Sequence, residues 1–219
     1  NIIRTKALVA GGISEKQIVG IGLAMDNVLY KNNNFENYTS LNLNPHYRLE
    51  NDDWKIRIGA QVDMAFGFGK KFRAAPDVAV EYNFADSYIL YAAKGGRVQN
   101  DFRRLEAFCP YGLVTSQPDA TYEQVNAALG FKASPAIGLW LNLYAGYQNL
   151  KDDLFFHPAG LDETTEGHYR TLAISQWNTS NIYAGAEVRY DYKNIFSFVA
   201  AGTYRSWDAK DNSQFGVKD

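Results

Sequence analysis

The three histidines and the acidic residues near them are the first candidates for chemistry in this sequence. His46 falls in a segment of alternating polarity, whereas His157 and His168 lie in a stretch with several carboxylates, namely Asp152, Asp153, Asp162 and Glu163. Such carboxylates can bind a hard cation, but the sequence contains neither the spacing of an EF-hand nor that of a zinc site. The pattern favours a solvated acidic loop, so we expect no metal and no cofactor.

Nucleophilic catalysis has no support in the sequence. No serine stands in a G-x-S-x-G elbow, the arrangement that exposes the nucleophile in α/β-hydrolases. The glycines and lysines of residues 67–71 lack the spacing of a phosphate-binding loop and precede a predicted strand rather than a helix. Cys109 is the single cysteine, which excludes an internal disulfide and a cysteine-rich zinc site. We therefore predict that the protein is not an enzyme.

Two adjacent arginines, Arg103 and Arg104, lie in a segment whose apolar residues recur at a helix-like spacing. One interpretation is a loop held together by its own apolar side chains, as in compact surface loops. The other is a short helix whose arginines contact an anionic substrate. The first interpretation is favoured, and both arginines remain candidates for a loop site.

The overall composition excludes several classes of protein. The chain has 219 residues, and its 22 Lys and Arg against 24 Asp and Glu give a formal net charge of −2. Nucleic-acid binders normally carry a basic excess on one face, so we expect no nucleic-acid partner. The mean hydropathy is −0.34, and no apolar run approaches the about 20 residues of a transmembrane helix. The aromatic share of 15% is high and needs an explanation.

Polar and apolar residues alternate along most of the chain. Every second residue from Trp54 to Phe66 is apolar, and the residues between them are polar or small. Successive side chains of a strand point to opposite faces, so each such segment predicts a strand with one apolar and one polar face. The predicted strands are Ile2–Ala10, Ile18–Tyr30, Thr39–Leu49, Trp54–Phe66, Phe72–Phe84, Ser87–Val98, Glu123–Phe131, Ile137–Tyr147, Ile182–Tyr192 and Ile195–Arg205.

The lengths of these segments and of their connections favour a membrane barrel. Most segments exceed the about 5–6 residues common in soluble proteins and match the about 9–11 residues with which a tilted strand crosses a bilayer. Short connections alternate with a set that includes two long ones, residues 99–122 and 148–181. Transmembrane barrels show this asymmetry, with short periplasmic turns and longer extracellular loops.

The two faces of the predicted sheet also suit a barrel in a membrane. Aromatic residues gather at the short-turn ends of the strands, as an interfacial girdle would, although aromatics also favour strands in general. These residues are Tyr47, Trp54, Tyr82, Phe84, Tyr88, Phe131, Tyr190, Tyr192 and Phe196. The polar faces would line the lumen, and the candidates there for binding are Lys55, Arg57, Asp63, Glu81, Glu187 and Arg189.

Several runs resemble hairpins of bacterial outer-membrane proteins. They are LNLNPHYR at 41–48, followed by WKIRIGA at 54–60, and AALGFK at 127–132 with LYAGY at 143–147. The kind most similar is the barrel part of TonB-dependent-receptor-like proteins, and the resemblance covers most of the chain. It implies a place in the cell outer membrane, contact with membrane lipid, and a role in moving or gating a small-molecule solute. An outer-membrane lipoprotein is a partner that the sequence leaves open.

We therefore expect an all-β fold, an antiparallel up-and-down meander of about ten long strands that forms a transmembrane β-barrel. A complete barrel keeps both termini on the periplasmic side, whereas this strand count puts both ends of the sheet on the long-loop side. Residues 1–219 are thus expected to be a single barrel domain or a fragment of a larger barrel. The alternatives are a soluble β-barrel or sandwich that binds a ligand or carbohydrate through aromatic residues, and an outer-membrane lipase or protease.

Overall fold

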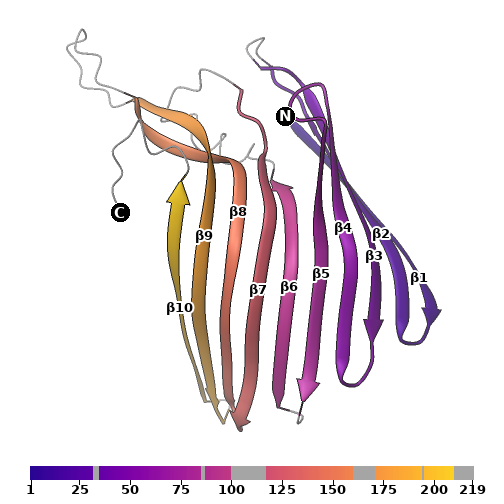
Figure 1. Ribbon diagram of the computed structural model, residues 1–219, viewed down its shortest axis with the longest axis vertical. Helices are drawn as coiled ribbons and strands as arrows, with labels where there is room; N and C mark the ends of the chain where they lie inside the picture. Colours follow the sequence, from indigo (N-terminus) through magenta and orange to yellow (C-terminus); the bar gives the residue numbers. More distant parts are fainter. Residues whose placement is uncertain (32–34, 85–86, 100–116, 160–170, 194, 210–219) are drawn as a thin grey trace.

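The protein is a single antiparallel sheet of ten strands (Figure 1). The computed structural model describes all residues except 32–34, 85–86, 100–116, 160–170, 194 and 210–219. The strands are β1 (Ile2–Ser14), β2 (Gln17–Val28), β3 (Tyr38–Glu50), β4 (Trp54–Phe66), β5 (Phe72–Phe84), β6 (Tyr88–Gln99), β7 (Thr121–Ala136), β8 (Leu139–Ala159), β9 (Thr171–Tyr192) and β10 (Phe196–Ala209). This arrangement confirms the predicted all-β meander.

Each strand pairs with its neighbour in the sequence, in the spatial order β1 to β10. Within the described part of the chain, β1 and β10 each pair on one side only, so the sheet is not closed. The described ranges contain no helix with the length and apolar character of a membrane span. The sheet is therefore an open meander whose two edge strands, β1 and β10, can each pair with a further strand.

Short connections lie at one end of the sheet and longer ones at the other (Figure 1). The strand pairs β1–β2 and β7–β8 are joined by residues 15–16 and 137–138. In the second of these turns Gly138 has a φ of +79°, a left-handed conformation that glycine adopts without strain. The expected alternation of connection lengths is therefore confirmed at the tight end.

Several strands are longer than predicted, and the predicted long loop at 148–181 is wrong. β8 continues to Ala159 and β9 begins at Thr171, with the ladder unbroken from Asp153↔Trp177 to Ala159↔Thr171. The register shifts between Leu150 and Asp153, and Asp152 takes a φ of +54° there. An extra residue at such a bulge inverts the polar–apolar parity, so a search for strict alternation ends the strand too early.

Smaller differences from the prediction have the same kind of cause. β1 continues through Gly11 and Gly12 to Ser14, although adjacent glycines are typical of a turn. β7 extends to Ala136 across a shift in register after Ala133, so Ile137 lies in a turn instead of starting β8. The longer loop predicted at 99–122 begins where β6 ends and stops where β7 starts; Arg103, Arg104 and the short helix considered around them lie outside the described residues.

The register sorts the side chains onto two faces. In β4, Ile56 and Ile58 pair with Val80 and Val78 of β5 on one face, which we call the outer face. Lys55 pairs with Glu81 on the opposite face, which we call the inner face. Apolar residues on the outer face stay exposed, among them Ile58 at 55% and Leu129 at 57%. The molecule therefore carries most of its apolar surface outside rather than in a core.

The predicted cluster of aromatic residues forms at the short-turn end of the outer face. The rings of Tyr82, Phe84, Tyr88 and Phe131 follow one another across β5 to β7, with neighbouring centroids 5.7–6.3 Å apart. A second group joins Tyr190, Tyr192 and Phe196 of β9 and β10. Offset aromatic pairs at this spacing attract one another beyond the burial of their area. The two clusters thus form an aromatic rim at the tight end of β5 to β7 and of β9 and β10.

Candidate functional site: the polar inner face

The sheet curls toward its inner face. The Tyr91 hydroxyl on β6 donates to Asn142 Oδ1 on β8 at 3.1 Å, across the intervening β7. The Tyr183 hydroxyl on β9 reaches Asn126 Oδ1 on β7 at 2.7 Å. Strands are about 4.8 Å apart, so side chains that span two spacings in this way converge on a concave surface. The polar residues therefore line a hollow instead of a flat face.

One network on this surface joins β3, β4 and β5. Arg57 Nη2 lies 2.8 Å from Asp77 Oδ2 and donates to Asn44 Oδ1 at 2.6 Å. Asn44 Nδ2 in turn donates to Asp77 Oδ2 at 2.9 Å. Because both charged groups are only part-buried, the pair keeps contact with water while holding the three strands at a fixed spacing.

Asp63 is the most deeply buried of the predicted lumen residues, at 6% exposed. Asn42 Nδ2 donates to its Oδ1 at 2.8 Å and also to Gln61 Oε1 at 3.0 Å. Its Oδ2 is buried and has no hydrogen-bond partner among the described residues. The carboxylate is thus oriented by the sheet rather than presented to a solute.

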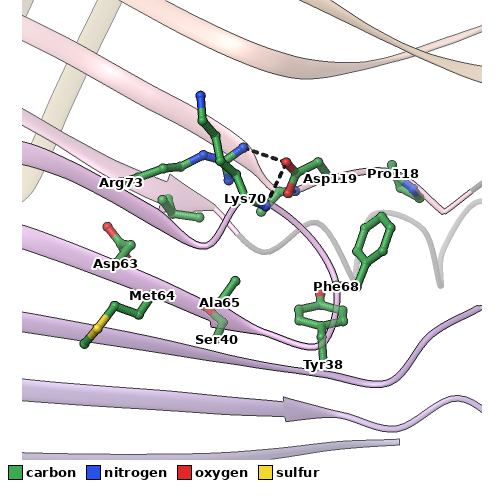
Figure 2. Close-up of a pocket in the computed structure, with 12 residues that line it drawn as sticks. Tyr38, Ser40, Asp63, Met64, Ala65, Phe68, Lys70, Arg73, Pro118 and Asp119 are labelled. Atoms are coloured by element: carbon green, nitrogen blue, oxygen red, sulfur yellow. Dashed lines mark hydrogen bonds and ion pairs between the residues drawn. The ribbon is translucent and has the colours of Figure 1, made fainter.

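A buried arginine near the long-connection end, Arg73, ties several segments of the chain together, and Figure 2 shows its ion pair with Asp119. Arg73 Nη2 on β5 lies 2.9 Å from Asp119 Oδ2 and 3.1 Å from Asp152 Oδ2, and its side chain is 4% exposed. Its guanidinium sits 5.5 Å from the Tyr122 ring centroid. Gln176 Nε2 on β9 donates to the backbone carbonyls of Asp119 and Asp152 at 2.7 and 2.8 Å.

The cavity beside this arginine is too small to hold a solute. It has a volume of about 20 Å³ and is lined by residues that include Asp63, Phe68, Arg73 and Asp119. That volume accommodates roughly one water molecule. We therefore assign the Arg73 cluster a structural role: it fastens the segment before β7 to the wall of the sheet.

Three tyrosines of the inner face occupy the space beside glycines of the neighbouring strand. Tyr91 covers Gly130, Tyr144 covers Gly185 and Tyr183 covers Gly146, so a Cβ added at any of these glycines would overlap the phenol ring. The Tyr144 hydroxyl also contacts Thr203 Oγ1 of β10 at 2.6 Å. These ring–glycine contacts place a row of hydroxyls along the middle of the hollow.

A buried carboxylate, Glu123, lies next to this row and accepts hydrogen bonds from side chains of β7 and β8. Glu123, 4% exposed, accepts from Asn126 Nδ2 at 2.8 Å and from Gln148 Nε2 at 2.6 Å. Arg205 Nη1 of β10 donates to Asn181 Oδ1 at 2.9 Å and to Gln148 Oε1 at 3.1 Å. Charged groups therefore belong to hydrogen-bonded networks, as polar groups inside a curved wall require.

A hollow on the inner face lies near the short-turn end. It has a volume of about 380 Å³ and is lined by Lys132, Trp140, Leu141, Asn142, Glu187 and Arg189. Trp140 is 55% exposed there, and Arg189 Nε lies 2.9 Å from Asp191 Oδ2. An exposed indole beside amide, carboxylate and guanidinium groups can hold a polar solute by stacking and hydrogen bonds.

The predicted lumen residues do not converge on one site. Glu187 and Arg189 share the 380 Å³ hollow, and Glu81 is joined to it through Lys132 Nζ at 3.5 Å. Arg57 and Asp63 belong to the separate networks of β3 to β5. Lys55 forms an exposed pair with Glu50 at 2.8 Å on the rim. Their common location is the inner face, and a role in binding stays a prediction.

Sequence reasoning missed Arg73, Asp119 and Trp140. Arg73 and Asp119 lie far apart in the sequence and meet only through the curl of the sheet. Trp140 is an apolar residue at a position where the alternation predicts a polar, inward-facing one, opposite Arg189. This departure from the alternation could have identified Trp140 from the sequence. No group of three or more potential metal-ligating residues gathers in the described parts of the chain.

No protein-family model matches the sequence, and no curated protein sequence matches it. Solved structures do match the fold. The siderophore receptor PirA from Pseudomonas aeruginosa aligns with a TM-score of 0.66 and 12% identity, over 95% of this chain and 43% of PirA. The FrpB iron transporter from Neisseria meningitidis (F5-1 variant) gives 0.64 and 10%, over 95% and 36%.

A third match is the pyoverdine outer membrane receptor FpvA from Pseudomonas aeruginosa PAO1, with a TM-score of 0.55, 13% identity, and coverage of 96% of this chain and 36% of FpvA. The chain thus spans less than half the length of the solved structures it matches. Identity this low shows shared fold alone. The fold is that of part of an outer-membrane β-barrel, similar to the barrel of TonB-dependent receptors.

Proposed function

We propose that this chain forms part of the wall of a bacterial outer-membrane β-barrel that takes up a small-molecule solute and has no catalytic role. The observation that carries the proposal is the two-faced sheet. Its outer face is apolar and exposed, with residues such as Ile58, Leu129 and Ile182 at 55–65%, and ends in an aromatic rim. Soluble proteins rarely expose so large an apolar surface to water, whereas membrane barrels present such a surface to lipid.

We further propose that the ten strands close into a barrel with additional strands. Support comes from β1 and β10, each of which has one unpaired edge in the described chain. Backbone groups of an open edge have no water to bond within a bilayer, so closure requires partner strands. The share of PirA and FrpB that the chain covers, 43% and 36%, agrees with a partial wall.

The class of solute follows from the names of the matching structures and from the hollow. PirA is described as a siderophore receptor and FrpB as an iron transporter. The inner face offers carboxylates, guanidinium groups, amides and an exposed indole. We propose a polar metal complex as the solute, with Lys132, Trp140, Asn142, Glu187 and Arg189 along its path.

Membrane location and uptake are tested separately. The product of the complete gene is expected to float with outer-membrane vesicles in a density gradient and to need detergent for extraction. A monodisperse, folded protein in plain buffer would instead support the soluble ligand-binding alternative. For uptake, a deletion strain should lose accumulation of radiolabelled iron supplied as a siderophore complex, and the wild-type gene should restore it; unchanged accumulation would remove that solute class.

A further inference from the structure

A lysine, Lys94 of β6, lies on the largely apolar outer face. Lys94 pairs with Val78 of β5 and Ala127 of β7, and it shares its face with exposed Leu90 and Ala92. Across the unbroken register that joins β5 to β9, the other outward-facing residues are uncharged. A lysine at the middle of a lipid-facing strand costs about 2–4 kcal/mol, so this ammonium needs a partner.

The surroundings of Lys94 open a way for its side chain toward the long-connection end. The next residues along β6, Gly95 and Gly96, have no side chains, and the neighbouring position on β7 is the small Ala127. A lysine stem of four carbons can lie along apolar surface while its ammonium reaches a polar level. The opposite direction leads into the aromatic rim around Tyr88 and Phe131, which offers no anion.

Two side chains with hydrogen-bond donors, Tyr147 and Asn149, lie on the same face of β8, two strands from Lys94. Tyr147 of β8 pairs with Ala127 on the side away from Lys94, so the two residues flank this alanine about 10 Å apart. Tyr147 is 43% exposed. Asn149, one outward position further along β8, donates from Nδ2 to the Tyr147 hydroxyl oxygen at 3.5 Å, which leaves the phenol O–H as a donor. Tyr147 also lies farther from its short turn than Lys94 does.

We propose that Lys94, Tyr147 and Asn149 bind the phosphate of a lipid headgroup against the outer face of the barrel. An ammonium, a phenol and an amide are all hydrogen-bond donors, and the outward positions that pair directly with them carry no carboxylate. The outward Asp208 lies two strands away from Asn149, beyond Ser180. Such a donor set matches a phosphate ester rather than a cation. Lipid is the source because the three residues face away from the hollow. The inference rests on the proposed membrane location.

The test uses the product of the complete gene, inserted into phosphatidylcholine vesicles with a minor fraction of phosphatidic acid. Native mass spectrometry then counts the lipid retained on the protein. Wild type should retain phosphatidic acid over phosphatidylcholine, and Lys94→Met should reduce that preference about fivefold, the contribution of one lysine near an anionic lipid surface. Lys94→Arg should keep it. Tyr147→Phe, which removes only the hydroxyl, should reduce it by less.

Lys6→Met is the matched control, because Lys6 lies on the inner face of β1 opposite Ala24 and should leave lipid retention unchanged. Equal retention of both lipids by the wild type, or an unchanged preference in Lys94→Met, would overturn the lipid site. So would cross-linking of Lys94 to a second protein in intact membranes. Displacement of the bound lipid by millimolar inorganic phosphate would also overturn it. Failure of the wild type to enter vesicles would overturn the membrane location itself, which separates the two proposals.

Discussion

At the scale of single residues, burial decides which charges hold the fold together. Lys55 and Glu50 are each about half exposed, and exposed ion pairs contribute about 0–1 kcal/mol. Arg73 has a side chain that is 4% exposed and contacts two carboxylates and a tyrosine ring. Hydrogen bonds that involve a charged group contribute about 1.5–3 kcal/mol each. The buried arginine should therefore matter far more than the exposed lysine.

Replacing Arg73 with Met is expected to lower the free energy of unfolding by about 2–3 kcal/mol, because Asp119 and Asp152 lose their shared donor but keep some contact with water. Lys55→Met is the control and should change it by less than about 1 kcal/mol. Urea unfolding from phosphatidylcholine vesicles, followed by tryptophan fluorescence, measures both. Equal effects of the two substitutions would argue against the structural role given to the Arg73 cluster.

At the scale of strands, glycines set how closely neighbouring side chains pack on the inner face. Gly185 on β9 leaves room for the flat ring of Tyr144 on β8, and the atoms nearest to an added Cβ all belong to that ring. Gly202 on the adjacent β10 has no atom within 4 Å of the same position. The two glycines lie on opposite faces, because Gly202 pairs with Ala186 of the outer face, and only Gly185 is covered by a ring.

Gly185→Ala should therefore destabilise the protein by about 1–3 kcal/mol through overpacking, whereas Gly202→Ala should be close to neutral. Combining Gly185→Ala with Tyr144→Ala should recover part of the loss, with a coupling of about 0.5–3 kcal/mol. Unfolding midpoints of the four variants complete the cycle. Strict additivity of Gly185→Ala and Tyr144→Ala would show that the ring and the glycine do not pack against each other in the membrane.

At the scale of the whole molecule, the proposal depends on which face meets lipid. Leu129 lies on the outer face at 57% exposed, one outward position further from the short-turn end than Phe131 of the aromatic rim. Ala201 of β10 lies on the inner face opposite Glu187. A soluble protein would present both faces to water, and an arginine at either position would then cost little. In a membrane barrel only the inner position is wet.

Leu129→Arg is expected to destabilise the protein folded in vesicles by about 2–4 kcal/mol, as arginine does on the lipid face towards the bilayer midplane. Ala201→Arg should be tolerated, because the arginine guanidinium can stay hydrated or pair with Glu187 on the inner face. Both are measured from the fraction folded against urea concentration in phosphatidylcholine vesicles. A comparable tolerance at both positions would contradict lipid contact at the outer face.

Alternation specified the clean strands well, and bulges limited it elsewhere. β4 and β5 begin and end where the pattern predicts, at Trp54–Phe66 and Phe72–Phe84. The pattern fails at Asp152 in β8, where one extra residue inverts the parity. Beyond the bulge, the β8–β9 hairpin was interpreted as a loop. A search for strict alternation assigns each residue to a face by its odd or even position. An extra residue at a bulge reverses that assignment, so the search ends the strand there.

The sequence by itself determined the all-β fold, the number of strands, the tight-turn end with its aromatic residues and the inward location of Lys55, Arg57 and Asp63, because all of these depend on local periodicity. Only the tertiary structure decided the cluster of Arg73 with Asp119 and Asp152, the hollow around Trp140, and the isolation of Lys94 on the outer face. Those features arise from register and curl, which bring residues from separate strands together and which no single segment encodes.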